Sequence, residues 1–122
     1  MIERVVVASQ NPDKIAEVES VLGDLGIDVI RGHQWPPVPE TEPTLEGNAL
    51  LKARAVVAYT GLAAIADDTG LEVVALDGAP GVMTARYAGP GATYSDNVSK
   101  LLEELGESTD RRARFRTAVA LV

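Results

Sequence analysis

The stretch Ala64-Ile65-Ala66-Asp67-Asp68-Thr69-Gly70 joins an apolar run to two adjacent carboxylates, a hydroxyl and a glycine. A short apolar run is typical of a buried strand, so we expect residues 62–66 to form a strand that delivers Asp67 and Asp68 at its tip. Two such carboxylates repel each other and lose hydration unless a cation, a proton or several donors compensate. The stretch therefore predicts a magnesium site, because magnesium prefers hard oxygen ligands. The alternative is a tight turn in which Gly70 supplies a positive φ.

Composition limits the classes of protein that fit. The chain has 122 residues, of which 46% are hydrophobic, and this is enough for one globular domain with a core. A net charge of −7 disfavours binding to nucleic acid or to an anionic membrane. The absence of cysteine excludes disulfides and thiolate metal sites, and His33 as the single histidine disfavours a His-rich zinc site. No apolar run approaches membrane-spanning length, so we expect a cytoplasmic protein.

The first 26 residues predict a strand, a turn and a helix. Residues 5–8 read as a strand that is buried on both faces. Asn11 suits the cap of the following helix, Pro12 suits its first position, and Gly26 ends it. The apolar stripe of this helix is Ile15, Val18, Val21, Leu22 and Leu25. Its start, with Lys14 close by, is suited to bind an anion, and capping alone is the other interpretation.

The middle of the chain predicts a second strand at 27–30, a loop at 32–43 and a helix at 45–60. Four prolines exclude a helix from the loop, which also carries Glu40 as either a solvated charge or a ligand. Thr44 suits the helix cap and Gly61 its end. Asn48 and Lys52 share one edge of this helix, where the lysine either reaches a phosphate or lies along the surface with its amine in water.

The last third predicts a strand at 71–76, a turn at 77–81, a helix at 95–105 capped by Ser95, and a strand from 112 onward. Arg112, Arg114 and Arg116 alternate along that strand, so we expect them to be solvated or paired with surface carboxylates. This alternation of strands and helices predicts a single α/β domain over residues 1–122, with a mixed twisted sheet, flanking helices and an active-site cleft. Because the sequence stops inside its last apolar strand, we expect it to be truncated.

Five motifs in order resemble the Ham1-type pyrophosphatases of non-standard purine nucleoside triphosphates, the dITP/XTP (inosine triphosphate) pyrophosphatase family. The resemblance covers nearly all 122 residues. The motifs are Ser9-x-Asn11-x-x-Lys14, Glu40 in the acidic loop, Asn48-Ala49-x-x-Lys52-Ala53, Ala66-Asp67-Asp68-Thr69-Gly70-Leu71, and Gly78-Ala79-Pro80-Gly81-x-x-x-Ala85-Arg86-Tyr87.

The resemblance implies magnesium-dependent hydrolysis of dITP, ITP or XTP to a nucleoside monophosphate and pyrophosphate, which cleanses the nucleotide pool. It implies that Asp68 is the proton acceptor and a magnesium ligand, and that Glu40 is the second metal ligand. It places a group of residues near the substrate: Ser9, Asn11, Lys14, Lys52 and Thr69. Asp67, Asn48 and Arg86 are secondary candidates. Family members are usually homodimers, so a homodimer is expected here.

The family's Gly-Phe-Gly-Tyr-Asp-Pro loop and its late Ser-His-Arg motif, which help choose the base, are not in this sequence, so the resemblance is to the N-terminal two-thirds. An inactive or non-catalytic nucleotide-binding fragment is therefore an alternative. A remote alternative is an aspartic protease, because Asp68-Thr69-Gly70 is also the signature triplet of that class. That fold is almost all β, whereas this sequence has helix-patterned segments and a charged Asp67 before the triplet.

Overall fold

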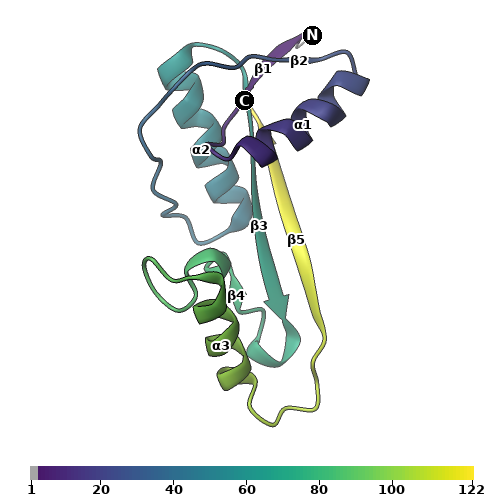
Figure 1. Ribbon diagram of the computed structural model, residues 1–122, viewed down its shortest axis with the longest axis vertical. Coiled ribbons are helices and arrows are strands. Elements are labelled where there is room, and N and C mark those ends of the chain that lie inside the picture. The colour runs from purple at the N-terminus through teal and green to yellow at the C-terminus, as the bar shows by residue number, and fades with distance from the viewer. Residues whose placement is uncertain (1–2) are drawn as a thin grey trace. The chain divides into compact units, whose positions relative to one another are not determined.

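The computed structural model describes residues 3–122, which form two compact units. The first unit holds the described residues up to Glu42, together with Glu46–Asp67 and Val119–Val122, and the second holds Pro43–Leu45 and Asp68–Ala118. The mixed α/β fold expected from the sequence is confirmed (Figure 1). Within the described part of the chain, no helix combines the length and the apolar content that crossing a membrane requires.

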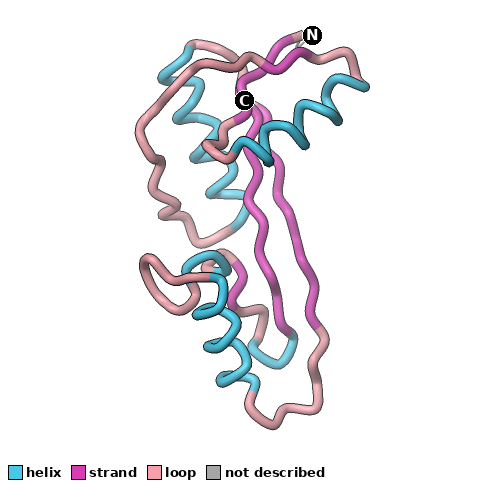
Figure 2. Tube along the Cα trace, in the orientation of Figure 1, coloured by secondary structure: helices cyan, strands magenta, loops and turns pink. Residues whose placement is uncertain are grey.

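The helices follow in the expected order, but the strands expected at 62–66 and 71–76 begin as one continuous strand, a short strand lies within the turn expected at 77–81, and two 3₁₀ turns are added (Figure 2). The elements are β1 (Arg4–Val7), α1 (Pro12–Asp24), β2 (Asp28–Val29), α2 (Leu45–Thr60), β3 (Ala64–Val73), η1 (Val74–Leu76), β4 (Pro80–Gly81), η2 (Thr84–Arg86), α3 (Tyr94–Leu105) and β5 (Ala113–Leu121).

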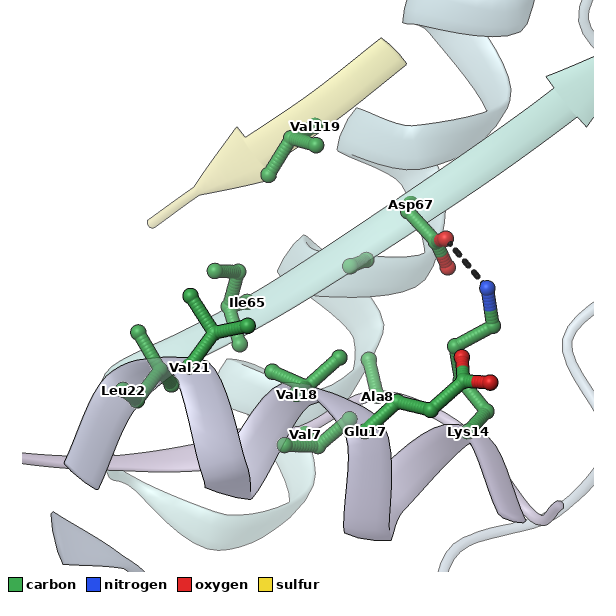
Figure 3. Close-up of a pocket in the computed structure, with 11 residues that line it drawn as sticks. Val7, Ala8, Lys14, Glu17, Val18, Val21, Leu22, Ile65, Asp67 and Val119 are labelled. Atoms are coloured by element: carbon green, nitrogen blue, oxygen red, sulfur yellow. Dashed lines mark hydrogen bonds and ion pairs between the residues drawn. The ribbon is translucent and has the colours of Figure 1, made fainter. Parts of the chain in front are cut away.

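In the first unit, β1 lies between β2 and the start of β3, and both neighbours are parallel to it. Val5, Val6 and Val7 are at most 5% exposed, which confirms that this strand is buried on both faces. Chains that cross between parallel strands do so with a right-handed turn. Because β2 and β3 lie on opposite sides of β1, α1 and α2 cover opposite faces of the sheet, as Figures 1 and 3 show.

β3 is longer than expected, and this corrects the prediction that Asp67 and Asp68 stand at a strand tip. The strand continues through both aspartates and Gly70 to Val73. Gly70 is not the positive-φ residue of a turn; a Cβ built on it would lie only 2.5 Å from the carbonyl oxygen of Gly81. The glycine is needed because β4 passes so close, pairing antiparallel with β3. The strand expected at 71–76 ends at Val73 and gives way to η1.

The cap of α3 is Thr93 rather than the expected Ser95, which lies inside the first turn. The Thr93 hydroxyl oxygen accepts a hydrogen bond from the Asp96 backbone N–H at 3.1 Å, and the Asp96 carboxylate accepts one from the Thr93 N–H at 2.9 Å. This reciprocal capping box uses two N–H groups that the helix itself leaves without partners. The acidic residue at the third helical position thus decides which hydroxyl residue caps the helix.

The arginines near the C-terminal end pair with carboxylates, as one of the two interpretations predicted. Arg114 and Arg116 both contact Glu72, at 2.7 and 3.0 Å, and Arg112 contacts Asp110 at 2.9 Å. Within the second unit, the two contacts with Glu72 tie β5 to the neighbouring strand β3.

The predicted stripe of α1 is only partly buried. Asn11 caps the helix and Pro12 begins it, as expected, and Leu22 is buried. Val21 and Leu25, however, are 63% and 70% exposed. In the described structure the packed face of α1 is therefore narrower than the stripe in its sequence.

Candidate active site

The turn from β1 into α1 is shaped by two of the predicted substrate residues. The Ser9 hydroxyl oxygen accepts a hydrogen bond from the Asn11 N–H at 3.1 Å, and the Asn11 side-chain oxygen accepts one from the Asp13 N–H at 3.0 Å. Both side chains thus use their oxygens to order the backbone at the start of α1. The helix dipole and the first-turn N–H groups make this end of α1 electropositive, and Lys14 adds a full positive charge in the same turn.

Lys14 forms an ion pair with Asp67 of β3. The Lys14 Nζ donates to Asp67 Oδ2 at 2.8 Å, and the two side chains are 34% and 26% exposed (Figure 3). This hydrogen bond to Asp67 is the main cause that raises the pKa of Lys14 above its usual value, against the opposing effect of burial, and the charge of Glu17 adds to the rise. Lys14 is therefore held as an ammonium group at a fixed place beside β3.

Lys52 brings the acidic loop to the same strand. Its Nζ lies 3.1 Å from Glu40 Oε1 and donates to the backbone carbonyl oxygen of Asp67 at 2.5 Å. The two side chains are 20% and 26% exposed. Lys14, Glu40, Lys52 and Asp67 are thus brought together within the first unit from four separate segments. We refer to these four residues as the charged cluster.

The charged cluster lies where the topology of the first unit favours a ligand site. The chain leaves β1 for β2 on one side and continues from β2 to β3 on the other, so the order of the strands reverses between β1 and β3. In open α/β sheets, ligands bind beyond the carboxyl ends of the strands at such a point. Lys14 follows the end of β1, and Asp67 lies on β3 past the residues that pair with β1.

A pocket of about 350 Å³ opens beside the ion pair between Lys14 and Asp67. Its wall is largely apolar, with Val18 and Leu22 from α1 and Ile65 from β3, while the ion pair lies at one end (Figure 3). Glu17, which the sequence did not single out, also lines it. Its position three residues after Lys14 on a helix is the signal that indicates their proximity.

Asn48 has a structural task in this unit. It is fully buried, its side-chain oxygen accepts from the Glu42 N–H at 2.9 Å, and its amide donates to the Glu42 carbonyl oxygen at 3.3 Å. Both hydrogen bonds fix the end of the loop that carries Glu40. The side chain thus acts on the charged cluster through the loop backbone.

The remaining predicted residues belong to the second unit. Asp68 is half-buried, and its Oδ2 atom is buried. Thr69 is exposed and shares a hydrogen bond of 2.8 Å with the Thr117 hydroxyl, while Arg86 ends η2. Successive side chains of a strand point to opposite faces, so Asp67 and Asp68 do not form the single carboxylate pair that their adjacency suggested.

Sequence and structure comparisons place the chain among known proteins. The sequence model of the Ham1 family matches residues 5–122. The chain belongs to the Ham1 family. A curated relative from an Exiguobacterium strain, named dITP/XTP pyrophosphatase, is 47% identical over 121 residues, and one of the same name from Aromatoleum aromaticum is 47% identical over 124 residues. A solved Ham1 protein from Coxiella burnetii has a TM-score of 0.87 and 41% sequence identity.

These matches cover almost all of this Ham1-family chain but less of its relatives. They include 97% and 100% of the chain against 62% and 63% of the two curated relatives, and 100% of the chain against 64% of the solved Coxiella burnetii structure. The Ham1 fold contradicts the remote aspartic protease alternative, because Asp68-Thr69-Gly70 lies inside a strand of an α/β fold rather than in an all-β one.

Proposed function

We propose that this Ham1-family chain provides the phosphate-binding and catalytic residues of a pyrophosphatase that hydrolyses dITP, ITP or XTP to a nucleoside monophosphate and pyrophosphate. The observation that carries the proposal is the charged cluster beside the electropositive start of α1. Two relatives, each 47% identical over nearly the whole chain, are named dITP/XTP pyrophosphatase.

Two lysines and one helix start suit a triphosphate. Lys14 and Lys52 each carry a positive charge on a side chain that is at least partly buried, where charge-assisted hydrogen bonds to phosphate oxygens are strong. The ordered backbone at Ser9 and Asn11 keeps N–H groups of the first turn of α1 aligned. These groups would hold the phosphates and orient the α-phosphorus toward water.

The proton acceptor in this proposal is Asp68, which immediately follows Asp67 in β3. A carboxylate on a rigid strand is suited to orient the attacking water and to take its proton as the bond to the α-phosphorus forms. The bond between the α-phosphorus and the bridging oxygen breaks, and pyrophosphate leaves with that oxygen. Thr69 would contact the substrate beside it.

A divalent cation, which we propose to be Mg²⁺, fits the donors that the chain offers. Among residues 3–122, no three His, Cys, Asp or Glu side chains form a cluster ready to hold a metal alone. The candidate ligands Glu40 and Asp68 are carboxylates, and hard oxygen ligands supplemented by phosphate oxygens and water are what Mg²⁺ prefers. When bound, the cation would neutralise the charge that develops on the phosphates.

The test is release of pyrophosphate by the purified protein with dITP, XTP, dATP and dGTP in the presence of Mg²⁺. We expect release from dITP and XTP that exceeds release from dATP and dGTP and that stops with a chelator. Nucleotide binding without any product would instead support the non-catalytic alternative, and release of single phosphates would contradict the proposed pyrophosphatase. We further propose that the protein acts as a homodimer in the cytoplasm, and light scattering at two protein concentrations tests the dimer.

A further inference from the structure

Both lysines that the proposed function assigns to phosphate are already held by oxygens of the protein. Lys14 contacts the Asp67 carboxylate at 2.8 Å, and Lys52 contacts Glu40 at 3.1 Å and the Asp67 carbonyl at 2.5 Å. In each ion pair the carboxylate occupies the place of a phosphate oxygen beside the ammonium group. The ammonium group likewise occupies the place of a cation beside the carboxylate.

We propose that these two ion pairs couple the binding of a divalent cation to the binding of a polyphosphate, so that either ligand alone binds weakly. The inference rests on the proposed function, since it concerns the same four residues of the charged cluster. It assigns to Asp67 a role of its own as the residue that positions Lys14 and competes with phosphate for it.

The physical reason is that either ligand, when it binds alone, meets an ion-pair partner that carries the same sign of charge as the ligand. A cation that approaches Asp67 meets the Lys14 ammonium group, which lies within hydrogen-bond distance of the same carboxylate. A polyphosphate that approaches Lys14 meets the carboxylates of Asp67 and Glu17, which flank that amine (Figure 3). When both ligands bind, the two lysines contact phosphate oxygens and the carboxylates of the two ion pairs face the cation, so neither ligand has to displace an ion-pair partner without supplying a replacement.

Burial makes this exchange significant. An ion pair in full contact with water contributes little, because water and salt screen it. The side chains of the Lys52–Glu40 pair are only 20% and 26% exposed, and those of the Lys14–Asp67 pair 34% and 26%. The Arg31–Glu19 pair has a contact distance of 2.7 Å, close to the 2.8 Å of the Lys14–Asp67 pair, but at 51% and 43% exposed it lies in water at the surface, and it serves as a matched control.

The coupling predicts that neutralising one residue of an ion pair raises the affinity of the protein for one of the two ligands. Lys14→Met removes the charge that opposes a cation, so its affinity for Mg²⁺ alone should rise roughly threefold to tenfold, whereas its affinity for tripolyphosphate alone should fall. Asp67→Asn should show the reverse, with a gain for tripolyphosphate alone and a loss for Mg²⁺ alone. Lys14→Arg retains the charge and should resemble the native protein toward Mg²⁺.

The experiment is calorimetric titration of the native protein and these variants with Mg²⁺ alone, with tripolyphosphate in chelator, and with both together. Glu19→Gln should change none of the three affinities, and circular dichroism shows whether each variant is folded. If a variant of the first pair does not fold, Lys52→Met and Glu40→Gln provide the same comparison at the second pair.

The coupling would be overturned if Lys14→Met and Asp67→Asn bound both ligands with the same affinities as the native protein. A loss of Mg²⁺ binding in Lys14→Met would also overturn it. If the native protein hydrolyses dITP while the gains are absent, the coupling is wrong and the proposed function stands. If neither ligand binds under any condition, the coupling and the phosphate site fail together.

Discussion

Asp67 and Asp68 share a peptide bond and yet have different surroundings. The Asp67 carboxylate accepts from Lys14, and its backbone carbonyl accepts from Lys52. Asp68 projects from the other face of β3, with its Oδ2 atom buried. The two neighbours therefore differ in what they contact: Asp67 is the partner of the lysines, whereas Asp68 is the proposed proton acceptor.

Asp68→Asn should lower kcat for dITP by roughly 10²- to 10⁴-fold, because an amide cannot take the proton of the attacking water. The two side chains have the same shape, so the thermal midpoint should stay close to that of the native protein. Pyrophosphate release measured beside a melting curve separates the two effects. Near-native turnover in a folded variant would remove Asp68 from the mechanism.

Gly70→Ala should destabilise the protein by about 1–3 kcal/mol, because the new methyl group would lie 2.5 Å from the Gly81 carbonyl oxygen and would push β4 from β3. Gly23→Ala is the matched control, since nothing lies within 4 Å of its added Cβ in α1. It should stabilise the protein by about 0.5–1 kcal/mol. Urea unfolding of both variants measures the difference, and opposite signs are the expected result.

At the scale of an element, α3 depends on the capping box at its start. Thr93→Ala should destabilise the protein by about 1 kcal/mol, since the Asp96 N–H loses its acceptor. Ser95→Ala, two residues after the cap, should change the free energy of unfolding little. Helix content by circular dichroism and urea midpoints for both variants test the assignment, and a larger loss in Ser95→Ala would reverse it.

The contact between β3 and β5 through Glu72 should make stability depend on pH. Arg114 first, and Arg116 second, lower the pKa of the Glu72 carboxyl below its usual value. A group whose pKa is lower in the folded state stabilises the protein above its unfolded pKa, near 4.5 for Glu72, and the stabilisation disappears as the pH falls through the folded pKa.

Glu72→Gln should therefore be less stable than the native protein at neutral pH, and the two should become equally stable as the solution is acidified. Urea midpoints across that range provide the measurement. A difference that persists unchanged in acid would mean that the substitution acts through packing rather than charge.

The elements that the sequence predicted well are those with local signals. Asn11 and Pro12 are adjacent in sequence and together define the start of α1. The helix α2 has the predicted bounds of residues 45–60. The elements it predicted poorly depend on distant partners. Gly70 is typical of a turn in the sequence, and only the fold shows that Gly81 lies against it, so the sequence alone predicts a strand that ends at residue 66.

The same reason limited the prediction of the site. Motifs named Lys14, Glu40 and Lys52 as members, but their pairing could not be read from spacing, since Lys14 and Asp67 are 53 residues apart in sequence. The fold determines which carboxylate pairs with each lysine. Local periodicity likewise could not show that Val21 and Leu25 would stay exposed on α1, because exposure depends on what packs there.

At the scale of the whole molecule, the net charge of −7 repels a polyphosphate. Local cations must therefore account for the proposed binding, and Lys52→Ala should raise KM for dITP by roughly tenfold with a smaller change in kcat. The increase should be larger at low salt, where charges are less screened. Steady-state kinetics at two salt concentrations test this, and an unchanged KM would make Lys52 a partner of Glu40 alone.

Because β3 has two different faces, the number of residues in this strand is constrained as well as their identity. One residue inserted between Ala66 and Asp67 would turn every later side chain of the strand to the opposite face, although no residue would be lost. A second inserted residue would restore the alternation. Insertions or deletions of a single residue in this strand should therefore be lost under selection.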